Sequence, residues 1–185
     1  MKRILWFPTN ALLQGIEYFY HKFKGLKPVG PLLYVQQTRY GGATHEFEDG
    51  LQLRPGDRVG VLHVNNRGLA RAQRSGRSSS FIFARLMIEA LGRLAEAVDE
   101  DPEMGRIAGF HGITWIPPHG RRVGFEAEPM PDSWRCRWLS LYFRILLFAF
   151  NPSASRRTPG RLQPCQFWLS RKQLLENFRP RHGQG

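Results

Sequence analysis

Acidic residues, cysteine and long apolar runs are all scarce in this sequence. Only 15 Asp and Glu residues stand against 27 Lys and Arg residues, so the formal net charge is +12, which favours contact with polyanions such as nucleic acid, anionic lipid or an acidic polymer. The two cysteines, Cys136 and Cys165, form no CxxC pair, which excludes a zinc ribbon and a disulfide framework. The longest apolar stretch, Trp138 to Phe150, would reach only about 20 Å as a helix, whereas the hydrocarbon core of a bilayer is about 30 Å thick. A membrane-spanning helix is therefore not predicted.

Motifs for export, metals and nucleotides are missing as well. The apolar run that follows Lys2-Arg3 is cut by Pro8, so it does not make a signal peptide, and we expect a cytoplasmic protein. The six histidines show no HxH, HExxH or HxxxH spacing, and the glycines form neither a phosphate loop nor a dinucleotide fingerprint. We expect no metal and no cofactor.

The residues that are present predict one folded α+β domain. Hydrophobic residues make up 42% of the chain and aromatic residues 12%, too much for an intrinsically disordered chain, and this length suffices for a single core. Residues 1–30 are predicted to be an amphipathic helix and a linker, residues 31–178 the domain, and residues 179–185 a frayed basic tail. Because strands and helices do not alternate strictly, we expect a largely antiparallel sheet of about five to seven strands, with two or three helices packed on one of its faces.

Hydrophobic periodicity and turn residues place the elements. Helices are predicted over 10–24, 80–98, 132–150 and 170–178, the last capped by Ser170. Asp49-Gly50 predicts a two-residue hairpin turn within residues 44–53. Further strands are predicted at 32–39, 58–65, 107–116, 122–128 and 166–169, with 122–128 returning as the partner of 107–116. Residues 66–80 are predicted to be a mobile basic loop, and 151–164 an irregular linker.

A series of short motifs follows along the chain in a distinctive order. The series is Arg39-Tyr40, Asp49-Gly50, Leu53-Arg54-Pro55-Gly56-Asp57-Arg58-Val59, Leu62-His63-Val64-Asn65-Asn66, the helix at 84–97, Gly109-Phe110-His111-Gly112-Ile113-Thr114, Gly124-Phe125-Glu126 and Ser170-Arg171-Lys172-Gln173-Leu174. In this order of motifs, Leu33 to Phe178 resembles the YkoP-like domain, a small bacterial domain found alone and attached to polysaccharide deacetylases. The resemblance implies a link to cell-envelope glycans or glycolipids. It does not imply deacetylase activity, because the metal motif of that enzyme does not occur in this chain.

Four polar residues make a candidate ligand site. His63 and Asn65 fall on the same face of their predicted strand, because side chains there repeat every two residues, and His63 is a candidate general base. Arg39 and Glu126 complete the candidate site. Two structural alternatives compete with it: a half-buried imidazole that is hydrogen-bonded to its neighbour, and a surface ion pair between Arg39 and Glu126.

Basic and aromatic residues gather in the predicted helices at 10–24 and 132–150. In the second of these, one wide apolar side is formed by Trp134, Trp138, Leu141, Ile145 and Phe148, while Arg137, Ser140 and Arg144 repeat on another. Such a helix either lies in a lipid headgroup region, with its arginines meeting phosphates, or packs its apolar side on the sheet and shows its arginines to water. The candidate membrane or anion contacts are Arg137, Arg144, Trp138, Lys22, Lys24, Arg156 and Arg157.

Three functions of different classes follow from these observations. The first is a non-enzymatic binding or accessory module, peripheral to the inner membrane surface or to an envelope-synthesis protein, that recognises an anionic lipid or an envelope glycan or glycolipid precursor. The second is a transferase or hydrolase that uses His63 and Asn65 on a polar envelope precursor. The third is nonspecific nucleic-acid binding through the arginine-rich loop and tail. No RNA-recognition aromatics, helix-turn-helix or zinc finger accompany those arginines, which counts against the third function.

Overall fold

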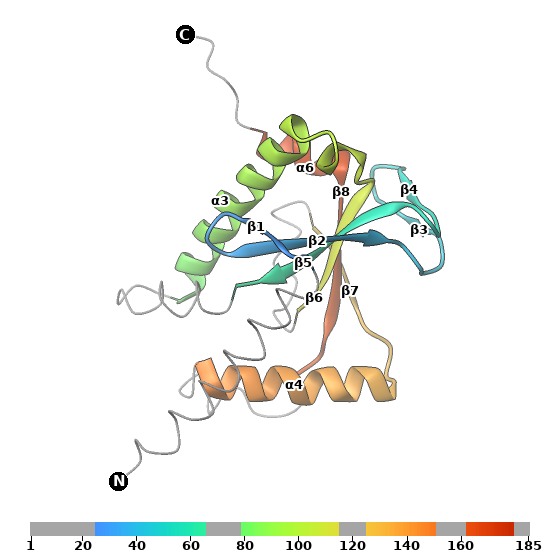
Figure 1. Cartoon of the computed structure of the whole chain (residues 1–185). Coiled ribbons are helices and arrows are strands. Elements are labelled where there is room, and N and C mark those ends of the chain that lie inside the picture. The colour runs from blue at the N-terminus through green and yellow to red at the C-terminus, as the bar shows by residue number, and fades with distance from the viewer. Residues whose placement is uncertain (1–24, 66–78, 115–124, 151–161, 180–185) are drawn as a thin grey trace.

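A mixed sheet crosses the centre of the molecule (Figure 1). The structure, a computed structural model, describes residues 25–65, 79–114, 125–150 and 162–179, and within these residues the sheet has six strands in the order β1-β2-β5-β6-β8-β7. The strands are β1 (Lys27–Val29), β2 (Leu33–Arg39), β5 (Arg58–Val64), β6 (Gly109–Thr114), β7 (Glu126–Pro129) and β8 (Cys165–Ser170). The pair β5 and β6 is parallel, and the other neighbours in this sheet are antiparallel. The predicted α+β class with a largely antiparallel sheet is confirmed.

The helix α3 (Ser79–Glu100) connects the two parallel strands. A parallel pair needs such a crossover, because the chain must return to the end of the sheet where the first strand began before the second strand can run in the same direction. The predicted apolar stripe of this helix is buried at Ile82, Ala90, Leu94 and Val98. It forms the main core with sheet residues that include Leu33, Val35, Phe110 and Leu169.

The short helix α6 (Arg171–Phe178) is capped at its N-terminus by Ser170, as predicted. The Ser170 hydroxyl accepts a hydrogen bond from the Gln173 backbone N–H at 2.9 Å, and the Gln173 side chain accepts one from the Ser170 backbone N–H at 3.1 Å. This reciprocal capping box satisfies two amides that the helix itself leaves without a partner. Leu174 of α6 is fully buried in the same core as α3.

The helix α4 (Trp134–Phe150) lies on the other face of the sheet (Figure 1). It packs through Phe143 and Leu146 in a cluster that includes Ile113 of β6. Side chains alternate along a strand, so Ile113 faces away from Phe110, which belongs to the α3 core. The expectation that all helices cover one face is therefore wrong, because a central strand such as β6 has apolar side chains on both of its faces.

A small hairpin joins β3 (His45–Glu46) to β4 (Gln52–Leu53), as the Asp49-Gly50 motif predicts. Its connection is longer than the predicted two residues, since residues 47–51 form the loop. The loop is closed by the Phe47 N–H, which donates to the Leu51 carbonyl at 2.8 Å, and by the Gly50 N–H, which donates to the Phe47 carbonyl at 2.9 Å. Gly50 has φ +80°, a backbone conformation that glycine adopts without steric cost. The hairpin packs on the sheet through a cluster of Phe47, Leu53, Val59 and Trp168.

Two strands differ from the sequence-based expectation. The glycines and prolines predict a linker through residue 30, but Lys27–Val29 pairs with β2 as an edge strand, and Val29 is buried. The segment at 122–128 was expected to pair with 107–116. Instead β7 pairs with β8, which lies between β7 and β6. A local sequence pattern predicts a strand, but it does not predict which other strand pairs with it.

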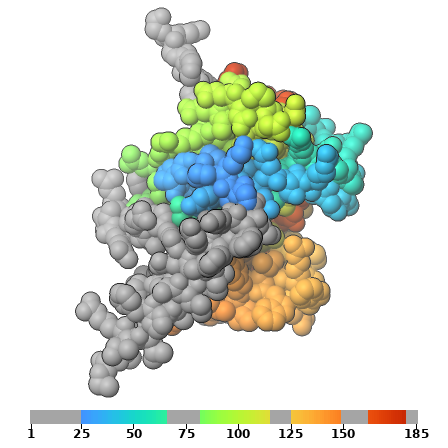
Figure 2. Space-filling model, viewed as in Figure 1, coloured from blue at the N-terminus to red at the C-terminus, as the bar shows by residue number. Residues whose placement is uncertain are grey.

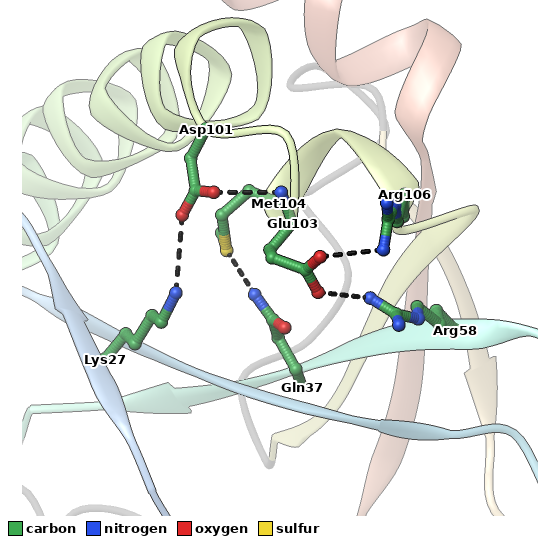
Figure 3. A network of polar contacts seen from close by, with 7 residues as sticks. All are labelled: Lys27, Gln37, Arg58, Asp101, Glu103, Met104 and Arg106. Carbon is green, nitrogen blue, oxygen red and sulfur yellow. Dashed lines mark hydrogen bonds and ion pairs between the residues drawn. The ribbon is translucent and has the colours of Figure 1, made fainter.

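Polar contacts join the end of α3 to the strands β1 and β5 (Figure 3). Lys27 Nζ lies 3.3 Å from Asp101 Oδ2, and Glu103 accepts hydrogen bonds from Arg58 at 2.5 Å and from Arg106 at 2.7 Å. The backbone N–H of Glu103 is the main cause that lowers the pKa of Asp101, and the hydrogen bond from Arg58 is the main cause that lowers the pKa of Glu103. These pairs are solvent-exposed, so each contributes little to stability.

Candidate functional site

The outer face of α4 exposes a continuous row of large apolar side chains. Trp134 is 76% exposed and Trp138 is 65% exposed. The other exposed members are Leu141, Tyr142, Ile145 and Phe148. Because a helix advances about 100° per residue, all six side chains fall within one sector of about 120°. We call these six residues the α4 face; Figure 2 shows α4 in orange at the lower right of the molecule.

The opposite side of α4 attaches the helix to the sheet. Cys136, Phe143 and Leu146 are buried there, and the buried Ser140 hydroxyl donates to the Leu162 carbonyl at 2.6 Å. The apolar side with Trp134 and Trp138, for which the sequence allowed contact either with lipid or with the core, therefore points outward. A second side, interrupted by a cysteine and a serine, makes the packing contact. Ser140, which repeats along the helix with Arg137 and Arg144, is buried, and its hydroxyl satisfies a buried carbonyl.

Arginines border the α4 face on both of its edges. By the same helical angle, Arg135 lies just beyond the edge at Tyr142, and Arg137 and Arg144 lie beyond the other edge. The helix contains no Asp or Glu. The Arg137 side chain is 72% exposed and lies 3.5 Å from Asp132, which precedes the helix. The α4 face is thus apolar in its middle and positive at its margins. In the part of the chain that the structure describes, neither this nor another helix has the length and apolar character to cross a membrane.

The polar candidates from the sequence lie at two ends of the sheet. His63 stands opposite Tyr34 of β2, whereas Arg39, five residues further along the same strand, stands opposite Arg58. At about 3.3 Å per residue, roughly 16 Å separates the two candidates. The structure therefore does not bring Arg39 to His63.

His63 and Asn65 bind neighbours on nearby strands and turns. His63 Nε2 lies 3.4 Å from Gln36 Oε1, and Asn65 Nδ2 donates to the Pro31 carbonyl at 3.3 Å. Asn65 follows the last residue of β5, and its backbone N–H donates to the Leu32 carbonyl at 2.6 Å. These are contacts expected of a half-buried imidazole and of a side chain that closes a turn.

Glu126 has partners other than the predicted Arg39. Its Oε1 accepts hydrogen bonds from the Glu48 backbone N–H at 2.7 Å and from Gln173 Nε2 at 3.2 Å, and its Oε2 lies 3.5 Å from His45 Nε2. Arg39 donates to a backbone carbonyl of the turn before β5 at 2.9 Å. The predicted ion pair between Arg39 and Glu126 is wrong, because β5, β6 and β8 separate their strands in the sheet.

Sequence reasoning missed a row of side chains that crosses three strands. The register places His111 of β6, Trp168 of β8 and Glu126 of β7 opposite one another, so the three side chains share one face. The His45 ring of β3 stacks on Trp168 from above the sheet, with ring centroids 4.1 Å apart. Alternation within each strand indicates which side chains share a face, but the register between distant segments is not visible in the sequence. We call His45, His111, Trp168 and Glu126 the cross-strand cluster.

The remaining basic candidates lie outside the described residues. These are Lys22, Lys24, Arg156 and Arg157, together with the predicted helix at 10–24, the loop at 66–78, the linker at 151–161 and the end of the tail at 180–185. The nucleic-acid interpretation depends mainly on these segments and stays a prediction.

The described features define a small α+β domain, with one mixed sheet, helices on both of its faces and a hairpin on one face. Within the described ranges, no group of three or more His, Cys, Asp or Glu side chains is arranged to hold a metal ion. The chain belongs to the YkoP domain family, since the model of that family matches residues 9–178. The match confirms the resemblance carried by the motifs and extends it toward the N-terminus. No curated protein and no solved structure matches this chain.

Proposed function

We propose that this protein is a non-enzymatic binding module that attaches to the anionic surface of a membrane through the α4 face. One observation supports the proposal above the others: six large apolar side chains are exposed together on one helix, with arginines along both edges. The proposed ligand is a negatively charged headgroup layer, either of anionic lipid or of an envelope glycolipid precursor.

Transfer of the apolar part of the α4 face from water to an apolar environment is favourable in free energy. Contiguous apolar surface on a folded protein commonly marks contact with a partner or a membrane. Full burial of one large apolar side chain contributes about 1.5–3 kcal/mol, so partial burial of several gives a useful binding energy. Trp134 and Trp138 add a preference for the headgroup region, where an indole ring meets apolar groups while its N–H keeps a hydrogen bond.

The charges favour a membrane over a purely apolar protein partner. A basic side chain close to an anionic membrane adds about 1 kcal/mol to binding. Arg135, Arg137 and Arg144 stand at the margins of the α4 face; the helix itself has no acidic residue, and Asp132, which precedes it, lies near Arg137. A bilayer offers an apolar layer with phosphates directly above it, and this order matches an apolar stripe between two cationic edges.

The enzymatic alternative has less support from the described contacts. Arg39, which together with Asn65 would hold a substrate beside the base His63, lies elsewhere on the sheet, and so does Glu126, the fourth residue of the candidate site. His63 Nε2 is within 3.4 Å of the Gln36 side chain, a contact that a substrate would have to displace.

Vesicle sedimentation of the full chain tests the proposal. We expect recovery with vesicles of phosphatidylcholine and phosphatidylglycerol at low salt, less recovery with phosphatidylcholine alone, and a loss of binding as salt screens the charges. Replacing both tryptophans (Trp134→Ser with Trp138→Ser) should lower the partition coefficient by on the order of tenfold or more. The matched control is Ile88→Ser, which changes a side chain that is 54% exposed on α3 and should leave binding unchanged.

A pair of charge variants tests the assignment to α4. Arg135→Gln with Arg137→Gln and Arg85→Gln with Arg93→Gln each remove two positive charges, the first pair from α4 and the second from α3. Only the first pair should weaken binding to anionic vesicles. Equal losses would mean that net charge alone attracts the protein, and no binding to either vesicle would overturn the membrane proposal.

A further inference from the structure

The β3–β4 hairpin is held on the sheet by contacts that converge on the cross-strand cluster. The Glu48 backbone N–H donates to Glu126 Oε1 at 2.7 Å, and the Ser170 hydroxyl donates to the Asp49 carboxylate. The His45 ring lies nearly parallel to the Trp168 ring, with an angle of 18° between their planes. The closed position of the hairpin thus depends on groups that titrate.

Three buried polar atoms of this cluster have no hydrogen-bond partner in the described part of the chain. They are His45 Nε2, His111 Nδ1 and Trp168 Nε1. His45 Nε2 is 3.5 Å from Glu126 Oε2, close enough for attraction between charges but without the geometry of a hydrogen bond. Buried polar atoms in folded proteins almost always have partners, so three unpartnered atoms on neighbouring rings call for an explanation.

The two imidazoles have unequal surroundings. His45 lies beside a carboxylate, with its Nε2 3.5 Å from Glu126 Oε2. His111 packs against Trp168 with ring centroids 5.0 Å apart and against Tyr40 with centroids 6.5 Å apart, and its buried Nδ1 has no hydrogen-bond partner among the described residues. Burial lowers the pKa of His111 first, and a charge on His45 lowers it further.

The titratable groups around His111 come from several elements. Among the described residues these are His45, Glu48 and Asp49 of the hairpin, Tyr40 after β2, and Glu126 of β7. Its neighbours in the register on β5 and β8, Val61 and Trp168, carry no titratable group. Of the carboxylates, Asp49 accepts a hydrogen bond from the Ser170 hydroxyl. Glu126 accepts hydrogen bonds from the Glu48 backbone N–H and the Gln173 side chain, and it lies near His45.

We propose that the cross-strand cluster is a proton-sensitive latch that holds the hairpin closed at neutral pH and releases it in mild acid. A proton on His111 Nδ1 has no acceptor among the described residues while the hairpin is closed, so it binds only when the hairpin lifts from Trp168. This device is independent of the membrane contact proposed for α4.

The sign of the pH dependence follows from the two states of His111. In the closed state its pKa is lowered, whereas in an open, solvated state it returns toward about 6.5. The open state therefore binds more protons below about pH 6.5, and the closed state loses stability as the pH falls through this value. One additional bound proton corresponds to at most about a tenfold change in the closing equilibrium per pH unit.

Hydrogen exchange measured by NMR on the full chain tests the latch. The reporter is the Glu48 amide, whose N–H donates to Glu126 only when the hairpin is closed. After correction for the intrinsic exchange rate, we expect its protection to fall by up to about tenfold per unit below pH 6.5. Amides of α3 should keep their protection over the same range. Constant protection of the Glu48 amide between pH 8 and pH 5 would overturn the proposal.

Two variants with opposite expected effects distinguish a latch from general acid sensitivity. His111→Gln removes the proton site and should flatten the pH profile, while His63→Gln on the same sheet should not. Glu126→Gln replaces the charged acceptor of the Glu48 N–H by a neutral amide, which weakens the closed state, so the hairpin should open at a higher pH than in the unmodified protein. Should His111→Gln fail to fold, the direction of the shift in Glu126→Gln decides: no shift or a downward shift contradicts the latch.

Discussion

The helices α3 and α4 lie on opposite faces of the same sheet and expose opposite kinds of surface. Both bury an apolar side. On its outer side α3 shows charges of both signs, including Arg93 and Glu89 with 3.2 Å between Nη2 and Oε1. The outer side of α4 is the α4 face, bordered by arginines, and the helix itself contains no acidic residue. An amphipathic pattern therefore identifies a helix, whereas two apolar sides on one helix indicate that one of them contacts something other than the core.

The largest effect in this comparison is expected from matched leucine truncations. Leu94→Ala in α3 removes a fully buried side chain and should lower the free energy of unfolding by about 2–5 kcal/mol, because it leaves a cavity. Leu141→Ala on the α4 face should change it by no more than about 0.5 kcal/mol. Urea unfolding of both variants measures the difference. If the two variants lose the same stability, the α4 face is covered in the folded protein and the contrast between the helices fails.

An intermediate effect is expected where α4 meets the rest of the molecule. Ser140→Ala removes the donor to the buried Leu162 carbonyl, and the unpaired carbonyl should cost about 1–3 kcal/mol in the free energy of unfolding. The same unfolding measurement tests it. A change below about 0.5 kcal/mol would show that the inner side of α4 is held by apolar contacts alone.

The smallest effect is expected on the outer side of α3. Glu89→Gln breaks the exposed pair with Arg93 four residues later, and such pairs are worth about 0.3–0.5 kcal/mol. Thermal unfolding at low and high salt should show a small loss that disappears as the charges are screened. A loss well above about 1 kcal/mol would mean that the charged surface of α3 is part of what holds the fold.

Features that depend on neighbouring residues were predictable from the sequence. The stripe of α3, the hairpin around Asp49-Gly50 and the Ser170 cap each arise from interactions within a few residues, and each is confirmed. The helix α4 was also predicted, but not the side that packs on the sheet. Both of its sides are apolar, and the outward side carries the larger rings, so hydropathy alone favours neither arrangement.

Features that depend on distant partners were not predictable. The insertion of β8 between β6 and β7 determines that Glu126 meets Trp168 and His45 rather than Arg39. Likewise, the cross-strand cluster exists only because the register aligns residues from three strands that are far apart in the chain. Its members look unremarkable in the sequence, where His45 lies beside acidic turn residues and His111 lies in an apolar strand.

The interior place of β8 has a consequence for how this chain is made. β8 follows the other described strands in the sequence, yet it lies between β6 and β7. While the ribosome has released only the chain up to α4, those two strands lack their common neighbour, and their open edges are free to pair with other nascent chains. We therefore expect polypeptides that stop short of residue 165 to be retained by chaperones or degraded rather than to accumulate as a partly working protein.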